Sequence, residues 1–212
     1  MNKTIFLISC VWLILVFNTA QATIQTAEEV VMSTADAVLA RLSTEREALD
    51  ADPGKIYGLV NEIVIPHFDF LSMSKWVLGK RNWRGASEAQ REKFVSEFRT
   101  LLIRTYAKAL LEYADESIEY LPVEENPDSS LVVVKTRIIQ SGSTAVPIDY
   151  RMHISGGEWK VVDLVVDGVS LISTYRGSFA SQIKKSGLDS LISKLSQRNA
   201  TMVSAGDNTA SN

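Results

Sequence analysis

The first part of the chain carries apolar residues at helical spacing. Over residues 27–49 they recur every three or four positions with charges between them, which predicts an amphipathic helix. The segment "ADPG" (residues 51–54) ends this helix, because proline and glycine interrupt helices. A short helix is expected over residues 55–65, before Pro66.

The clearest pattern is a long helix that starts after Ser87. Ser87 with Gln90 three residues later forms a capping-box signature. Behind it runs one stripe at helical spacing, made by Phe94, Phe98, Leu101, Leu102, Thr105, Tyr106, Ala109, Leu110 and Tyr113.

The pattern then changes to short β-branched and aromatic runs. Four of them, "SIEYLPV", "SLVVVKTRIIQ", "AVPIDYRMHIS" and "EWKVVDLVVDG", are separated by segments of turn composition, which predicts a four-stranded antiparallel meander. In the third run Val146, Ile148 and Tyr150 alternate with more polar positions, which predicts that one face of the sheet is buried and the other is exposed to solvent. The fourth run is apolar on both faces except at Asp163, which favours a doubly covered strand.

After Gly168 the helical spacing returns in two stripes. One runs from Val169 to Ile183 and the other over residues 188–195, with a break at Gly187. Residues 198–212 are small and polar, and we expect a disordered tail there. Helices, then strands, then helices indicate an α+β domain in which a twisted antiparallel sheet packs against helices.

The chain opens with a segment typical of a secretory signal peptide. Lys3 precedes an apolar run over residues 5–17, and "AQA" (residues 20–22) supplies the small residues of a cleavage site. We therefore expect residues 1–22 to be removed on export. A retained anchor fits less well, because a spanning helix needs roughly 20 apolar residues. Lipoprotein processing at Cys10 would leave much of the apolar run behind the cysteine.

Cysteine and charge narrow the function classes. Cys10 is the only cysteine, so the mature chain has no disulfide, no thiol nucleophile and no cysteine metal ligand. Removing Lys3 and no acid takes the net charge from −3 to −4. An acidic protein without a basic block is a poor nucleic-acid binder, because phosphate contacts supply most of that affinity. Residues 23–197 suffice for one domain with a helical annex.

No common catalytic constellation is visible. The sequence lacks a G-x-S-x-G elbow, a phosphate-binding glycine loop and an H-E-x-x-H motif. Its two histidines, His67 and His153, are far apart in the chain, so we expect no zinc site and no cofactor. Asp163 is the best candidate for a perturbed acid, although a strand acid bonded to a neighbouring backbone or cation is the simpler interpretation.

Two features leave alternatives open. The apolar faces of the sheet and helices can bury one another as an ordinary core, or they can leave a cavity for an apolar ligand. The segment "MSKWVLGKRNW" (residues 73–83) combines two tryptophans with Lys75, Lys80 and Arg81. The tryptophans can pack inside while the cations reach water, or the segment can be a docking surface for a lipid phosphate or an acidic partner.

Three motifs stand out in the chain: F-D-F with M-S-x-W-V-L-G (residues 68–79), Q-R-x-x-F (residues 90–94) and D-G-V-S-L-I-S-T-Y-R (residues 167–176). Together they resemble the MlaC family of phospholipid-binding proteins of the Mla (toluene tolerance) system. The similarity is continuous over about residues 26–195. One departure is Asn82, where the family pattern has an aromatic residue or histidine before Trp83, and it bears only on local packing.

The resemblance implies a periplasmic carrier that holds a phospholipid by its acyl tails. Its N- and C-terminal helical parts would enclose an apolar cavity against the sheet. It would shuttle the lipid between an outer-membrane lipoprotein complex and the lipid-binding subunit of an inner-membrane ABC transporter, which maintains outer-membrane lipid asymmetry. The lining we expect comprises Leu102, Tyr106, Val132, Val134, Ile138, Val146, Ile148, Tyr150, Met152, Val162, Leu164, Val166, Leu171 and Tyr175.

Two other function classes stay open at this point. An isomerase or hydrolase in a cone-shaped α+β fold would need polar groups that converge in a pocket, and Asp163 with Tyr150 is the pair the sequence offers. A periplasmic chaperone or adaptor would expose apolar residues on its surface and carry no stoichiometric lipid.

Overall fold

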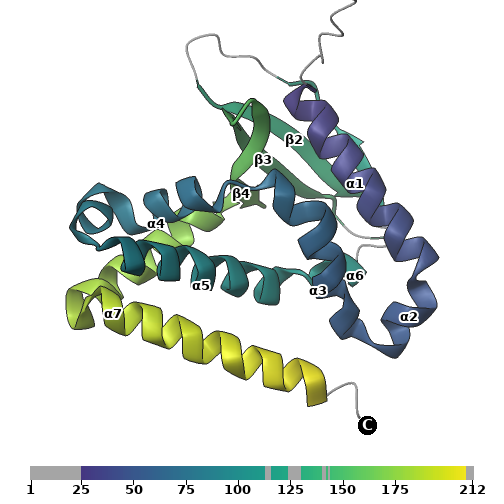
Figure 1. Ribbon diagram of the computed structural model, residues 1–212. Coiled ribbons are helices and arrows are strands. Elements are labelled where there is room, and N and C mark those ends of the chain that lie inside the picture. The colour runs from purple at the N-terminus through teal and green to yellow at the C-terminus, as the bar shows by residue number, and fades with distance from the viewer. Residues whose placement is uncertain (1–24, 113–115, 124–129, 140–141, 143, 209–212) are drawn as a thin grey trace, which may run out of the picture.

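The computed structural model describes residues 25–112, 116–123, 130–139, 142 and 144–208, so the predicted signal peptide lies outside it. A single antiparallel sheet stands between an N-terminal and a C-terminal set of helices (Figure 1). The helices are α1 (Ala27–Thr44), α2 (Arg46–Ala51), α3 (Ile56–Leu59), α4 (Phe70–Gly85), α5 (Glu88–Tyr106), α6 (Ala109–Glu112) and α7 (Leu171–Asn208), with the short turns η1 (Pro53–Lys55), η2 (Val60–Val64) and η3 (Ile65–His67). The strands are β1 (Ser117–Tyr120), β2 (Val132–Ile139), β3 (Val146–Ser155), β4 (Glu158–Val166) and β5 (Val169–Ser170).

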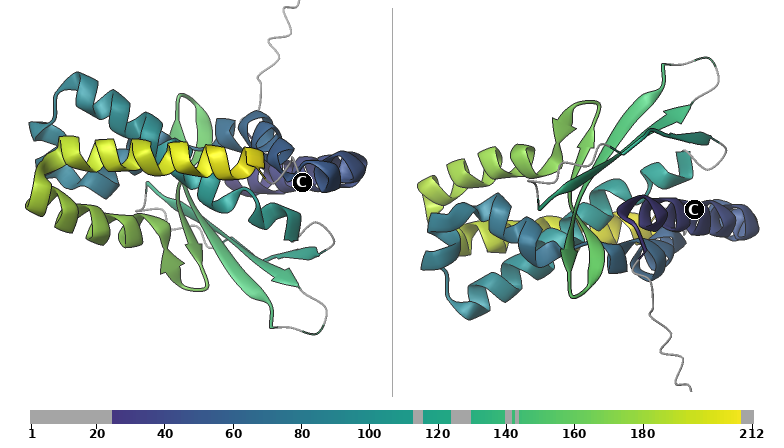
Figure 2. Two further views of the ribbon diagram at one scale, coloured as in Figure 1. Left: turned by 90° about the horizontal axis from the view of Figure 1, so that it is seen from below. Right: turned by 90° about the horizontal axis from the view of Figure 1, so that it is seen from above.

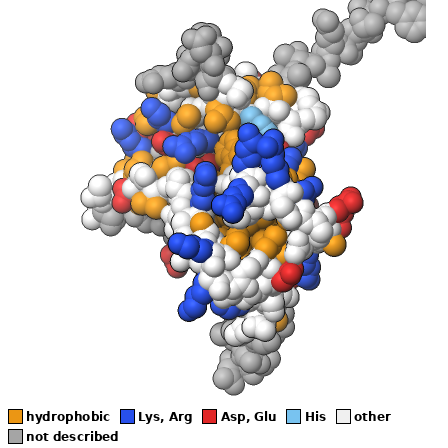
Figure 3. Space-filling view, turned by 90° about the vertical axis from the view of Figure 1, so that its left-hand side faces the viewer, with side chains coloured by type: hydrophobic (Ala, Val, Ile, Leu, Met, Phe, Trp, Pro, Cys, Tyr) orange, Lys and Arg blue, Asp and Glu red, His pale blue; other side chains and the backbone are white. Residues whose placement is uncertain are grey.

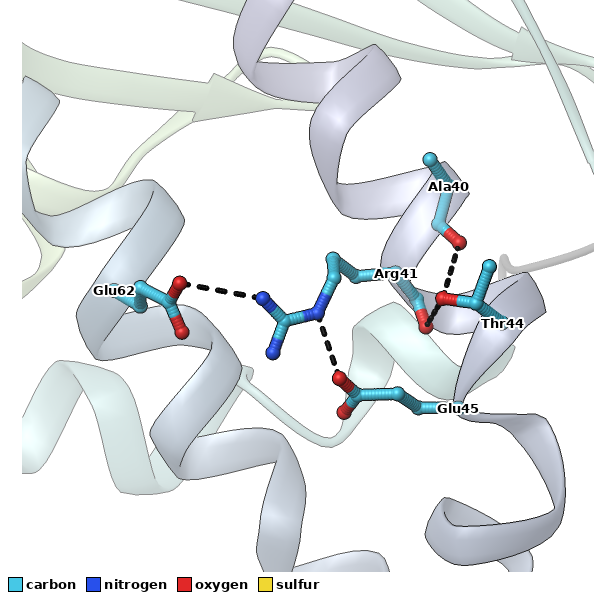
Figure 4. A network of polar contacts seen from close by, with 5 residues as sticks. All are labelled: Ala40, Arg41, Thr44, Glu45 and Glu62. Carbon is cyan, nitrogen blue, oxygen red and sulfur yellow. Dashed lines mark hydrogen bonds and ion pairs between the residues drawn. The ribbon is translucent and has the colours of Figure 1, made fainter.

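The N-terminal helices pack as a hairpin-like unit. A capping box of Thr26 and Glu29 starts α1, and the predicted helix breaks at Glu45 before α2 resumes. Arg41 bonds Glu45 Oε1 at 2.7 Å and Glu62 Oε1 at 3.2 Å, which links α1 to η2 (Figure 4). The helix predicted over residues 55–65 is found as α3 followed by η2.

The long helix begins where the sequence predicts. The Gln90 N–H donates to Ser87 Oγ at 3.2 Å, and the Ser87 N–H donates to Gln90 Oε1 at 2.9 Å. Phe94, Phe98 and Leu101 of α5 are fully buried in a core shared with α4 and α7. The regular helix ends at Tyr106 and continues as α6, and the predicted end at residue 113 lies outside the described residues.

The sheet is a meander of five strands, not the predicted four. All neighbours pair antiparallel in the order β1-β2-β3-β4-β5. The fifth strand exists because Asp167 and Gly168 have φ of 49° and 77° and reverse the chain. Val169 therefore pairs with Val166 in β5 instead of starting the helix, and α7 begins at Leu171.

Strand β4 is covered on both faces, as predicted. Val161, Val162 and Asp163 are consecutive and expose only 3%, 0% and 2% of their surface. Successive strand side chains point to opposite faces, so both faces are buried at this point. A register shift between Arg151 and Met152 of β3 lies opposite this segment.

Helix α7 confirms one prediction and corrects another. Gly187 has φ 82° and ψ 168°, which divides α7 where the sequence predicts a break. The helix then runs to Asn208, so the expectation of disorder from residue 198 is wrong for residues 198–208. Asn199 is 5% exposed and donates to the Glu97 carbonyl and carboxylate, and Met202 packs against the core, which anchors this segment. Residues 209–212 lie outside the described residues.

The helices form a layer beside the sheet. Helices α4, α5 and α7 lie side by side and share one apolar core, and the strands run across one end of them (Figure 2). A second cluster joins α1, α2 and α3 to the end of α5, and a third joins α1 to the sheet. Among the described helices, none combines the length and apolar character needed to cross a membrane.

Candidate ligand-binding site

The strand register gathers apolar side chains of β3 and β4 on one face of the sheet. Ile148 lies opposite Val166, and Tyr150 lies opposite Leu164. Because side chains alternate along a strand, these four project from the same face, and the intervening Asp149 and Val165 project from the other. The predicted sheet residues are thus brought together from two strands.

Helix α1 covers one end of this apolar face. Ala27, Val30 and Val31 of α1 form a buried cluster with Val134, Met152 and Val161. Of the predicted lining residues, Val134 and Met152 are 0% exposed in this cluster. Leu102 lies in the helical core and Val162 is buried in β4. These four side chains fill packed core in the structure.

Most of the remaining predicted lining residues keep part of their surface. Tyr106 is 41% exposed, whereas Ile138, at 9%, belongs to the buried core. The half-buried members are Val132, Val146, Ile148, Tyr150, Leu164, Val166, Leu171 and Tyr175. Tyr150 and Leu164 pack against the edge of the α1 cluster and still keep part of their surface. With Ile148 and Val166 they form a half-buried apolar surface on β3 and β4 next to the part that α1 covers.

Two tyrosines on or beside this surface stay neutral. Burial raises the pKa of Tyr150 to about 12. Burial, followed by a hydrogen bond with Tyr106, also raises the pKa of Tyr175. A neutral phenol donates and accepts hydrogen bonds but is not a base at ordinary pH, so these groups suit binding better than proton abstraction.

The pair that an enzyme would need does not converge. Asp163 lies opposite Arg151, on the face of the sheet away from Tyr150. Its carboxylate accepts hydrogen bonds from Arg151 Nη1 at 3.0 Å, from Ser170 Oγ at 2.6 Å and from the backbone N–H of Ile172 at 3.1 Å. Asp163 is thus a structural acid that fastens the start of α7 to β4.

One of the two histidines, His153, supports a helix cap. His153 Nε2 lies 2.9 Å from Asp69 Oδ2, and Asp69 caps α4 by accepting the Ser72 N–H at 2.9 Å. His67 lies at the end of η3, where burial and then the charge of Lys160 lower its pKa. Within the described parts of the chain, no three His, Cys, Asp or Glu side chains are grouped to hold a metal ion.

A second candidate site lies at the bend of α4. Gly79 has φ 72° and ψ 157°, so the helix is interrupted there. Lys75 and Lys80 line a pocket of about 380 Å³ beside it, and Arg176 of α7 packs against Gly79, since an added Cβ would lie 3.6 Å from its guanidinium. Figure 3 shows Lys and Arg side chains gathered on this face around apolar ones.

The composition of this basic pocket was only partly predictable. The sequence singles out Lys75, Lys80 and Arg81, but Arg81 is exposed and does not line the pocket. Arg84 and Arg176 do line it, together with Trp76 and Trp83. Among the described residues, none of its four cations forms an ion pair, so their charge is available to an anion. Arg176 could not be placed here from the sequence, because it lies 97 positions after Gly79 in the chain.

The fold and the site show that this is an α+β protein whose antiparallel sheet presents a half-buried apolar face suited to a ligand. The profile of the family described as "MlaC protein" matches residues 32–197. The chain belongs to the MlaC family.

Individual relatives agree with this membership. The chain is 28% identical over 165 residues to the toluene tolerance protein ttg2D of Pseudomonas putida, covering 78% of this chain and 76% of that protein. It is 29% identical over 183 residues to the intermembrane phospholipid transport system binding protein MlaC of Haemophilus influenzae, covering 84% and 85%. A solved phospholipid-binding protein from Ralstonia solanacearum, in complex with a phospholipid, superposes with a TM-score of 0.76 at 32% identity, covering 84% of this chain and 99% of that one.

Proposed function

We propose that the protein is a periplasmic carrier that binds a phospholipid by its acyl tails and shuttles it between the outer and inner membranes. The observation that supports this most directly is the half-buried apolar surface of β3 and β4, centred on Ile148 and Tyr150. The Ralstonia relative with the same fold holds a phospholipid, and the relative from Haemophilus is named for phospholipid transport.

Burial of acyl chains supplies enough free energy for such a role. Burying a methylene contributes about 0.8 kcal/mol, so two chains of about fifteen methylenes gross on the order of 20 kcal/mol. The same chains gain a similar amount in a bilayer, so the carrier does not have to hold its lipid far more tightly than a membrane does. Release can then be controlled by contacts with partner proteins.

The basic pocket of α4 and α7 is the docking or headgroup site in this proposal. Its cations would meet acidic groups of the inner-membrane transporter subunit or of the outer-membrane lipoprotein complex, or a lipid phosphate. Lys80→Glu with Arg176→Glu should then slow lipid delivery and make it less sensitive to salt. Delivery at the normal rate would mean that the pocket is only structural.

The direct test of the carrier is uptake of lipid from a membrane. Delipidated mature protein is mixed with vesicles that carry a fluorescent phospholipid and is then separated from them. We expect the protein to remove lipid up to about one molecule per chain, because acyl tails would bury the part of the apolar face that stays half-exposed. A protein that stays empty after this treatment is not the proposed carrier.

A further inference from the structure

A second hollow of the described surface lies away from the apolar sheet face. It is a groove of about 760 Å³ along one side of α5, walled by α4 and by α3 with η2. Figure 1 shows these helices next to one another. The residues of α5 that line it recur every three or four positions from Glu88 to Arg104. At 1.5 Å per residue this face is about 24 Å long.

Three arginines stand along the groove, each over an aromatic ring. The guanidinium carbon lies 5.5 Å from the ring centre of Trp83 for Arg91, 5.9 Å from that of Phe70 for Arg99, and 4.0 Å from that of Tyr57 for Arg104. Stacking on a ring fixes the orientation of a guanidinium and leaves its N–H groups for a ligand.

The three arginines differ in how many hydrogen bonds they make within the protein. Arg91 donates to the carbonyls of Trp83 and Arg84, so it mainly joins α4 to α5. Arg99 donates to Asn61 Oδ1 at 3.0 Å. Among the described residues, Arg99 and Arg104 have no carboxylate partner. A carboxylate entering the groove would therefore meet two oriented and unneutralised cations.

The groove also offers an apolar strip. Leu71 of α4 is 49% exposed, and Val95 and Ile103 of α5 are half-buried, and all three line the groove. Glu88 and Glu92 lie at the opposite end from Arg99 and Arg104. The groove is thus elongated, has an apolar strip along it, and is acidic at one end and basic at the other.

We propose that this groove binds an amphipathic α-helix of a protein partner. Its apolar stripe would contact Leu71, Val95 and Ile103, and its carboxylates would pair with Arg99 and Arg104. A helix matches the straight groove, whose length corresponds to about sixteen helical residues, and recognition of this kind relies on apolar anchors at i, i+3, i+4 and i+7. Val95 and Ile103 are half-buried between the helices, where the side chains of a docked helix reach them more readily than a flat anionic membrane does. The inference goes beyond lipid carriage, because the groove and the apolar sheet face share no predicted lining residue.

The test uses a synthetic probe. A sixteen-residue helical peptide with Leu at helical spacing and Glu toward one end is labelled and titrated with lipid-loaded mature protein, and fluorescence anisotropy is recorded. A second peptide carries Lys in place of each Glu. We expect the acidic peptide to bind at least about tenfold more tightly and to weaken as salt rises, because paired charges add to the apolar contact.

Protein variants locate the binding. Arg99→Glu with Arg104→Glu should lower the affinity for the acidic peptide at least about tenfold. Leu71→Ala changes an exposed side chain and so leaves the fold intact, and it should lower the affinity for both peptides. Lys194→Glu, an exposed cation on α7, is the matched control. No binding to the wild type, equal binding of the two peptides, or insensitivity to these substitutions would overturn the proposal. If the Arg99→Glu, Arg104→Glu variant still binds the peptides but no longer binds anionic vesicles, the groove is a membrane contact and the proposal is overturned. Lipid content measured in the same samples keeps this result separate from that of the carrier proposal.

Discussion

The Asp163 carboxylate of β4 accepts a hydrogen bond from the backbone N–H of Ile172 at 3.1 Å, so a buried strand acid holds the start of α7. Ser170 Oγ, which itself accepts the N–H of Ser173, donates to the same carboxylate. The connection joins the sheet to the helix that carries Leu171, Tyr175 and Arg176. It thereby positions residues of both candidate sites.

Replacing this acid should destabilise the fold without touching the ligand face. Asp163→Asn should lower the free energy of unfolding by about 2 kcal/mol, because a charge-assisted pair is lost and a buried donor is left poorly matched. Urea unfolding measures the change. Asp149→Asn is the control, since this half-buried acid makes no side-chain hydrogen bond or ion pair to another described residue. Equal effects of the two substitutions would contradict the assigned role.

The cap of α4 should give stability that depends on pH. Burial alone would raise the pKa of Asp69, but hydrogen bonds from the Ser72 N–H and hydroxyl and from His153 outweigh it and lower the pKa. A lowered folded-state pKa stabilises the protein above the unfolded-state pKa, about 3.9, and this stabilisation is lost as the pH falls through the folded-state value.

Asp69→Asn isolates this contribution, because asparagine can still cap the helix but carries no charge. The substitution should cost about 1 kcal/mol at pH 7, and the difference from wild type should shrink below about pH 4. Urea unfolding at a series of pH values follows it. A difference that stays constant from pH 7 to pH 3 would show that the charge of Asp69 contributes nothing.

A charge placed on the apolar sheet face should expel the ligand. Ile148→Glu should reduce co-purified phospholipid more than about tenfold, because a carboxylate is costly to hold against acyl chains. Val169→Glu is the matched control, since Val169 is 58% exposed in β5. Organic extraction with phosphate analysis gives the lipid content, and circular dichroism checks the fold. If both variants keep their lipid, the binding face lies elsewhere.

Local patterns predicted much of the fold. The capping box of Ser87 and Gln90, the break at Gly187 and the meander all follow from short-range preferences. The extra strand was missed because Val169 is apolar and fits a helical stripe, although the preceding Asp-Gly pair is a known hairpin signal. The polar segment after residue 197 was misjudged because its anchor, Asn199 on Glu97, joins residues 102 positions apart.

The candidate site, too, was predictable from the sequence only in part. Alternation along β3 places Ile148 and Tyr150 on one face, and the register adds Leu164 and Val166. Which of the apolar residues α1 would bury could not be predicted, since Val134 and Met152 carry the same alternation as their neighbours. Contacts between distant segments decide what is core and what is left for a ligand.

The measurement that tests the central claim most directly is mass spectrometry of an organic extract of the purified mature protein, compared with an unrelated protein prepared in the same way. The account predicts about one phospholipid per chain, because the apolar face of β3 and β4 would be filled by acyl tails. An extract no richer in phospholipid than the control, from a protein that also takes up none from vesicles, would contradict it.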